Sequence, residues 1–297
     1  MNRNKFITGV ATLLLGFMFS CDNTTADPIN NTVNNNGNPG SGGGSAPSIT
    51  GPRILHKINV NNVTNQEFVT TGTTLEKAIF KEASGPNSFL IGNVTYTLGK
   101  VTKVKFAQEV NGVPANSLAY DFNVTYDSSG KINGTTCSTT LGSTPSFNSE
   151  YTYTYDGSGK MTKIVEKKKM GSTYTHFSNY NFTNTGDNIS KVVVESGVTS
   201  STGVPDMSTV MASTYNFSGY DSKINPYTTL PKTFFVMWSL MHPLNFSSLS
   251  ANNITNFSVV YPAPAPAIPG AYTYLYDTQN YPVSDQTQSQ KYIYKAL

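Results

Sequence analysis

Aromatic and polar residues alternate most regularly over residues 151–155, where three tyrosines alternate with two threonines. A period of two is typical of a β-strand that buries one face. Residues 156–159, Asp-Gly-Ser-Gly, have the composition of a type I turn, and alternation resumes over residues 161–164. The segment 151–164 is therefore predicted to form a β-hairpin.

Weaker copies of this hairpin lie on both sides of it, around residues 124–132, 180–192 and 274–280. Tyr126 and Tyr155 are 29 residues apart, and Tyr155 and Phe182 are 27 apart. Repetition at a nearly constant period indicates one structural unit that is used several times. We therefore predict an all-β fold, an antiparallel meander of tandem hairpins in an open or curved sheet. The predicted turn-forming residues are Asp127, Gly130, Asp156, Gly159, Asp277 and Asn280, with Asn280 in the place of a glycine.

Two segments interrupt the hairpin pattern. Residues 231–246 are dense in large apolar side chains, and Phe234, Trp238 and Met241 follow helical spacing. We expect one short helix or a buried loop there, packed on the sheet. Residues 262–269 contain four prolines. Since proline cannot donate to a strand ladder, we expect this run to cross over outside the sheet.

The amino-terminal segment has the layout of an export signal. Basic residues at positions 3 and 5 precede an apolar run over residues 6–19, which is shorter than the roughly 20 residues that span a bilayer. The run ends at Ser20-Cys21 and resembles a bacterial lipoprotein signal. We predict a signal peptide over 1–20, lipid attachment at Cys21, a flexible Asn-, Gly- and Ser-rich tether over 21–52, and a β-repeat domain over 53–297.

The hairpin over 151–164 also resembles the tyrosine-aspartate (YD) repeat of large bacterial β-shell proteins, with Tyr155, Asp156 and Gly159 at consensus positions. The whole chain is similar to a Bacteroidota-type family of lipoproteins of unknown function that contain such hairpins. Late signatures of that family are matched at residues 220–226, 252–254 and 280–282. The resemblance implies an all-β fold and an anchored location, and it transfers no catalytic residue.

Composition narrows the class of partner. Charged residues make up 12% of the chain, against about 25% in ordinary soluble domains. Loss of residues 1–20 would lower Lys+Arg from 20 to 18 and leave Asp+Glu at 17, a net charge near +1. Nucleic-acid binding depends on clustered basic side chains, so no nucleic-acid partner is expected. Cys137 would be the one thiol beside Cys21, either a small buried side chain or a reactive or intermolecular thiol.

The sequence offers no local motif for catalysis or metal binding. The three histidines are 120 and 66 residues apart, and no zinc spacing, phosphate loop or nucleophile elbow occurs. Each predicted turn supplies one aspartate, whereas calcium takes roughly six to eight oxygen ligands. Turn formation is therefore favoured over calcium binding for these aspartates. We predict no catalytic residue, no metal and no cofactor.

The aromatic side chains have two interpretations. Tyr151, Tyr153 and Tyr155 point to one face of their strand. They can form the core, with their hydroxyls at its edge. Alternatively, they can line a platform that stacks sugars or grips an apolar ligand. Phe234 and Trp238 are further candidates for contact with a ligand.

Together these features favour a lipid-anchored, non-catalytic lipoprotein of the outer membrane, on its periplasmic or its surface face, that acts as a binding or scaffold module. Its partners would be the membrane, through the lipid, and a glycan, an apolar ligand or a protein. Two alternatives stay open. One is a carrier of an apolar ligand in a curved, aromatic-lined sheet, and the other is a hydrolase whose carboxylates are brought together by the fold.

The anchor can be tested directly. Cys21→Ala removes the sulfur that would carry the lipid, so the variant should move from the membrane fraction to the soluble fraction on cell fractionation. Cys137→Ala is the matched control, and it should stay with the membranes. A Cys21→Ala variant that remains in the membrane fraction would refute lipid attachment at this position.

Overall fold

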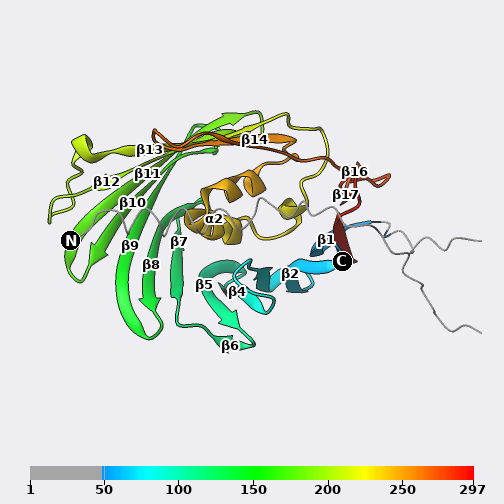
Figure 1. Ribbon diagram of the computed structural model, residues 1–297, viewed down its shortest axis with the longest axis horizontal. Coiled ribbons are helices and arrows are strands. Elements are labelled where there is room, and N and C mark those ends of the chain that lie inside the picture. Colours follow the sequence, from blue (N-terminus) through cyan, green and yellow to red (C-terminus); the bar gives the residue numbers. More distant parts are fainter. Residues whose placement is uncertain (1–48, 50) are drawn as a thin grey trace, which may run out of the picture.

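The structure is a computed structural model that describes residue 49 and residues 51–297. Most of these residues belong to one curved sheet and to a helical segment on its concave side (Figure 1). The predicted signal peptide, Cys21 and all but the last few residues of the predicted tether lie outside the described residues.

Within the described part of the chain, eighteen strands form the sheet. In chain order they are β1 (Arg53–Val60), β2 (Val63–Thr71), β3 (Thr74–Lys81), β4 (Ser88–Thr97), β5 (Lys100–Val110), β6 (Val113–Pro114), β7 (Leu118–Tyr126), β8 (Ile132–Leu141), β9 (Thr144–Tyr155), β10 (Met161–Met170), β11 (Thr173–Thr185), β12 (Asn188–Val198), β13 (Met211–Ser218), β14 (Asn256–Val260), β15 (Ile268–Ala271), β16 (Leu275–Tyr276), β17 (Pro282–Ser284) and β18 (Gln290–Ala296).

Strands that follow one another in the chain pair antiparallel. The series runs from β1 to β5, continues from β5 to β7, and proceeds to β15. The last strand, β18, pairs with β1. β15 pairs with β14, and β16 pairs with β17. No pairing joins β15 to β16 within the described residues, so the sheet is not closed there. The predicted all-β antiparallel meander is confirmed.

The connection between β13 and β14 is a helical insertion, residues 219–255. It contains the 3-10 helix η3 (Pro226–Thr229), the α-helix α2 (Lys232–Met241) and the 3-10 helix η4 (Pro243–Leu249). A further 3-10 turn, η2 (Met207–Thr209), precedes β13. The short helix predicted within 231–246 is thus observed as α2. No helix in the described part of the chain has the length and apolar character needed to cross a membrane.

Aromatic side chains of α2 form the centre of the core. Phe234, Phe235 and Trp238 are 0%, 1% and 8% exposed. The Trp238 ring stacks on Phe80 with centroids 4.4 Å apart, and the Phe234 ring lies 5.5 Å from that of Phe106. Burial of each such side chain stabilises the fold by about 1.5–3 kcal/mol. The concave face of the sheet is therefore covered by the chain's own helix (Figure 1).

The close approach of α2 to β4 depends on a glycine. A Cβ atom at Gly92 would lie 2.8 Å from Cε1 of Phe106 and 2.9 Å from Cε2 of Phe234. Both distances are shorter than ordinary van der Waals contact, so a larger residue would push the helix away from the sheet.

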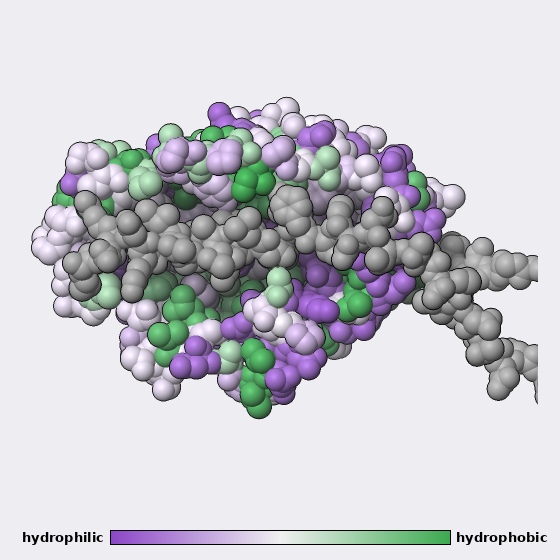
Figure 2. Space-filling view, in the orientation of Figure 1, coloured by the Kyte–Doolittle hydropathy of each residue, from purple (hydrophilic) through white to green (hydrophobic). Residues whose placement is uncertain are grey.

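The outer surface is more polar. On the face shown in Figure 2, polar residues predominate and apolar residues occur in small separate groups. The most exposed large apolar side chain among the described residues is Leu98, at the turn between β4 and β5. Apolar residues scattered singly are normal on a protein surface.

The expectation that residues 262–269 lie outside the sheet is wrong in part. Residues 262–267 do lie outside it, but Pro269 belongs to β15 and pairs with Ser258 of β14. β15 has no strand on its other side among the described residues. A proline is tolerated in an edge strand because its missing N–H leaves no ladder bond unmade on the open side.

Candidate functional site

Alternate turns of an antiparallel meander lie at the same end of the sheet. The turns between β4 and β5, β7 and β8, β9 and β10, and β11 and β12 share one end, and the helical insertion leaves β13 from that end as well. We call it the turn end. The predicted aspartate turns and the helical insertion therefore meet in space.

The aspartate turns share one hydrogen-bond arrangement. Asp127 Oδ1 accepts from the backbone N–H groups of Ser129 and Lys131, each at 2.9 Å. Asp156 and Asp277 accept the equivalent bonds from residues two and four positions later. The Ser129 hydroxyl and then the Lys131 amide hold the pKa of Asp127 below its usual value. The closing residues have positive φ angles: 83° at Gly130, 84° at Gly159 and 68° at Asn280.

Neighbouring hairpins separate at the turn end, and tyrosines link them there. The ladder between β8 and β9 ends at the pair Gly134–Thr152, which leaves the carbonyl of Ile132 beyond it. The Tyr155 hydroxyl donates to that carbonyl at 2.9 Å. The same bond recurs from Tyr96 to Leu75 (3.1 Å), from Tyr126 to Val101 (2.7 Å) and from Tyr220 to Ile189 (2.6 Å). We call these bonds the tyrosine links.

Each tyrosine link satisfies a carbonyl that no strand reaches. A hydrogen bond of this kind contributes about 0.5–1.5 kcal/mol net. A tyrosine hydroxyl with its ordinary pKa of about 10 is already a protonated donor at neutral pH, and burial raises the pKa of Tyr155 further, to about 12. Lysines of the preceding hairpins lie over two of the rings, with Lys100 Nζ 5.2 Å from the Tyr126 centroid and Lys131 Nζ 5.3 Å from the Tyr155 centroid. Such contacts add a cation–π attraction.

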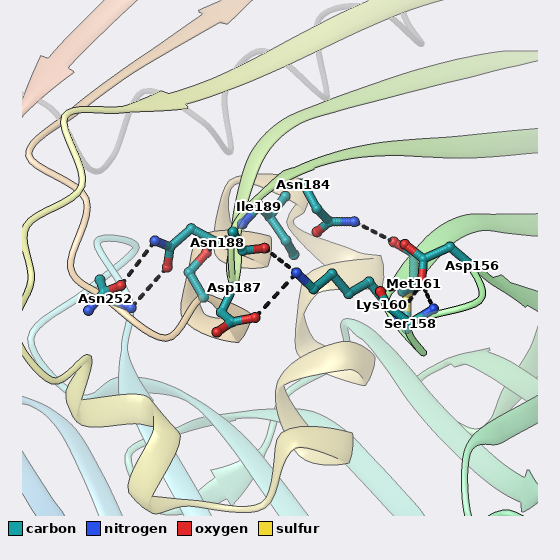
Figure 3. A network of polar contacts seen from close by, with 11 residues as sticks. Asp156, Ser158, Lys160, Met161, Asn184, Asp187, Asn188, Ile189 and Asn252 are labelled. Atoms are coloured by element: carbon teal, nitrogen blue, oxygen red, sulfur yellow. Dashed lines mark hydrogen bonds and ion pairs between the residues drawn. The ribbon is translucent and has the colours of Figure 1, made fainter.

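The hairpin of β11 and β12 departs from this pattern. Asn184 pairs with Ile189 across this hairpin, just as Tyr155 pairs with Met161 across the hairpin of β9 and β10. Asn184 therefore occupies the register position of Tyr155. The Asn184 Nδ2 donates to the Met161 carbonyl at 3.0 Å (Figure 3). Asn184 therefore makes the same link to the preceding hairpin with a much smaller side chain. Asn184 is 29 residues after Tyr155, so the assignment of Phe182 as the equivalent of Tyr155 is wrong by two residues.

A pocket of about 310 Å³ lies beside Asn184, at the position where the hairpins β4–β5, β7–β8 and β9–β10 carry a tyrosine ring. Its floor includes the buried side chains of Ile189, Leu230 and Phe235. Its other walls come from the two hairpin turns, from η3 and from η4. The pocket thus has an apolar interior and a polar mouth, and its volume is at the lower end of the range for small-molecule sites.

Among the described residues, three charged side chains line the pocket: Lys160, Asp187 and Lys232. Lys160 Nζ donates to the Gly186 carbonyl at 2.5 Å and lies 3.3 Å from the Asp187 carboxylate (Figure 3). Within the described residues, no ion pair engages Lys232. Desolvation lowers the pKa of the Lys232 ammonium, and the Asp187 carboxylate opposes that effect. Lys232 is nevertheless an exposed residue, so solvent screens both effects.

Amide side chains hold the walls of the pocket together. Asn188 Nδ2 donates to Asn252 Oδ1 at 3.1 Å, and the Asn252 backbone N–H donates to Asn188 Oδ1 at 3.0 Å (Figure 3). Tyr227, on the insertion side, donates its hydroxyl to Gln66 Oε1 at 3.0 Å. These bonds join the β11–β12 turn and strand β2 to the helical insertion, so the pocket is formed without a ligand.

A second pocket, of about 300 Å³, lies on the other side of the start of α2. Its lining includes Tyr96, Lys100, Tyr126 and Thr233. Here the tyrosines of the links are present, and the Tyr126 hydroxyl lies 3.0 Å from Thr233 Oγ1. This pocket is more open to solvent, so the pocket beside Asn184 is the better candidate site.

The predicted ligand-contacting residues lie elsewhere. Tyr151, Tyr153 and Tyr155 face the concave side, and Tyr151 is 6% exposed with its hydroxyl donated to Glu166 at 3.0 Å. Phe234 and Trp238 are buried in the core around α2. None of these five residues lines the pocket beside Asn184, whereas Gly159 of the predicted turns does.

The remaining candidates are placed as follows. Cys137 is buried on β8, and burial raises the pKa of its thiol to about 12. Cys21 lies outside the described residues. Within those residues, no group of three or more His, Cys, Asp or Glu side chains is arranged to hold a metal ion.

Comparisons with known proteins found no matching family model and no matching curated protein. The solved structures that match include two porin-like proteins. A porin-like protein from Bacteroides vulgatus has a TM-score of 0.45 and 11% identity, over 80% of this chain and 96% of that chain. A porin-like protein from Bacteroides uniformis has a TM-score of 0.35 and 13% identity, over 82% and 96%. Similarity at this level carries no argument about function.

If the pocket occupies the place of a missing tyrosine ring, Asn184→Tyr should fill it. The added ring would bury apolar area against Leu230 and Phe235, and the free energy of unfolding should rise by about 1–2 kcal/mol in chemical denaturation. Asn148→Tyr, on an exposed position of β9, is the matched control and should change stability by less than about 0.5 kcal/mol. Destabilisation by Asn184→Tyr relative to this control would contradict the assignment.

Proposed function

We propose that this protein is an outer-membrane lipoprotein, anchored through lipid on Cys21, that acts as a non-catalytic binding and scaffold module. The anchor is supported by the charged start, the short apolar run and Ser20-Cys21. The binding role is supported by the preformed pocket at the turn end. The lipid would hold the sheet at the membrane, and the pocket would take a small ligand.

The observation that carries the binding role is the substitution within the repeat. Asn184 keeps the hydrogen bond of the tyrosine links but not the ring. A repeat that lacks the tyrosine ring at one position buries less apolar area there and is less stable for that reason. Such a sacrifice of stability is typical of functional sites. The space left has apolar floor residues and a few polar groups at its mouth, which is the composition of a small-molecule site.

The charged groups around the pocket favour binding over hydrolysis. Hydrolysis by paired carboxylates needs two of them about 5–9 Å apart across a cleft. Asp187 is the one carboxylate among the described lining residues, and Lys160 pairs with it. A carrier of an apolar ligand, the alternative to a scaffold, would use this pocket rather than the space under Trp238, because Phe80 occupies that space.

The binding role predicts that a small neutral apolar molecule enters the pocket. Met161 lines it, so its methyl group reports on occupancy. We expect 1-hexanol to shift the ¹³C-methyl NMR signal of Met161 in the full chain held in lipid nanodiscs. The signals of Met207 and Met211, which are 62% and 57% exposed, should stay unchanged.

Asn184→Tyr is the variant that separates pocket binding from uptake into lipid. It should abolish the response of Met161 while the lipid disc takes up the same amount of hexanol. An unresponsive Met161 in the wild-type protein, or an equal response in both proteins, would sink the proposed binding site.

A further inference from the structure

We infer that the ligand of this pocket is a monoanionic amphiphile, a carboxylate with a short alkyl or acyl chain, whose head binds Lys232. This inference rests on the proposed binding function of the pocket and specifies its ligand class. It follows from the charges at the mouth, the position of α2 and the size of the apolar interior.

The charges at the mouth do not balance. Lys160 and Asp187 neutralise each other, and Lys232 leaves the lining residues that the structure describes with a net formal charge of +1. An ammonium beside apolar groups loses part of its hydration, and a carboxylate brought to it would offset that loss through a charge-assisted hydrogen bond. A monoanion matches this charge, whereas a cationic ligand would add to the net positive charge.

The start of α2 adds to the same preference. Lys232 is the first residue of the helix, the first turn has no acidic residue, and Pro231 provides no side-chain cap. The N-terminal end of a helix carries partial positive charge and unsatisfied N–H groups, so a lysine there is unfavourable without an anion nearby. Leu230, Lys232 and Phe235 all line the pocket, which places this positive end at its wall.

The volume of the apolar interior limits the length of the ligand's alkyl chain. A volume of about 310 Å³ corresponds to roughly ten water molecules at about 30 Å³ each. A ligand of about eight to ten non-hydrogen atoms therefore fits, with its alkyl chain on Ile189, Leu230 and Phe235 and its carboxylate at the mouth. Hexanoate has this form, and 1-hexanol is its neutral counterpart of nearly equal size.

The test compares these two probes at pH 7 by the Met161 methyl signal of the full chain in nanodiscs. Hexanoate should bind at least about fivefold more tightly than 1-hexanol, since its head gains the ion pair with Lys232. Lys232→Met keeps the length of the side chain without the charge, and it should remove this preference while hexanol binds as before.

Lys191→Met is the matched control, because Lys191 is exposed on β12 and does not line the pocket. It should keep the fivefold preference. Lys232→Glu, a second variant, should reverse the preference in favour of hexylamine.

The outcomes distinguish the two proposals. Equal binding of hexanol and hexanoate to the wild-type protein, or a hexanoate preference that survives Lys232→Met, would overturn the anionic ligand and leave the pocket as a binding site. Failure of both probes to shift Met161 would overturn the binding function and the ligand class together.

Discussion

The hydrogen bond from a tyrosine hydroxyl to a backbone carbonyl of the preceding hairpin is the interaction on which the turn end of this protein depends. Strand ladders between hairpins stop about two to four residues short of the strand ends, as at Gly134–Thr152, and the carbonyls beyond them need another donor. Tyr155 reaches the carbonyl of Ile132. Tyr96 and Tyr126 make the same bond in their own hairpins, and Tyr220 makes it at the start of the helical insertion. Successive hairpins are therefore joined where their backbones have already separated.

This constraint explains the composition of the repeat and the location of the pocket. In the hairpins β7–β8 and β9–β10, the aspartate fixes the turn, the tyrosine before it makes the link, and a lysine lies over the tyrosine ring. Asn184 satisfies the carbonyl of Met161 with an amide instead. The carbonyl is still paired, so the hairpin remains joined to its neighbour, and the missing ring leaves room for a ligand between the turn and the helical insertion.

Much of the fold could be predicted from the sequence, because local chemistry determines it. The alternation at residues 151–155 and the turn residues after it predict a hairpin. The apolar spacing of Phe234 and Trp238 indicates a short helix or a buried loop, and the structure has the helix. The pocket could not be predicted in the same way. Phe182 and Asn184 lie on the same face of β11. From the sequence alone, the aromatic Phe182 is the more obvious equivalent of Tyr155. Only the pairing of Asn184 with Ile189 shows which residue has the place of the tyrosine.

The contribution of the links is measured most directly by the free energy of unfolding of Tyr155→Phe, which removes the hydroxyl and keeps the ring. The carbonyl of Ile132 would lose its donor, and stability should fall by about 1 kcal/mol. Tyr272→Phe is the comparison, since no hydrogen bond of the Tyr272 hydroxyl is found within the described residues. A Tyr155→Phe variant as stable as Tyr272→Phe would contradict a structural role for the tyrosine links.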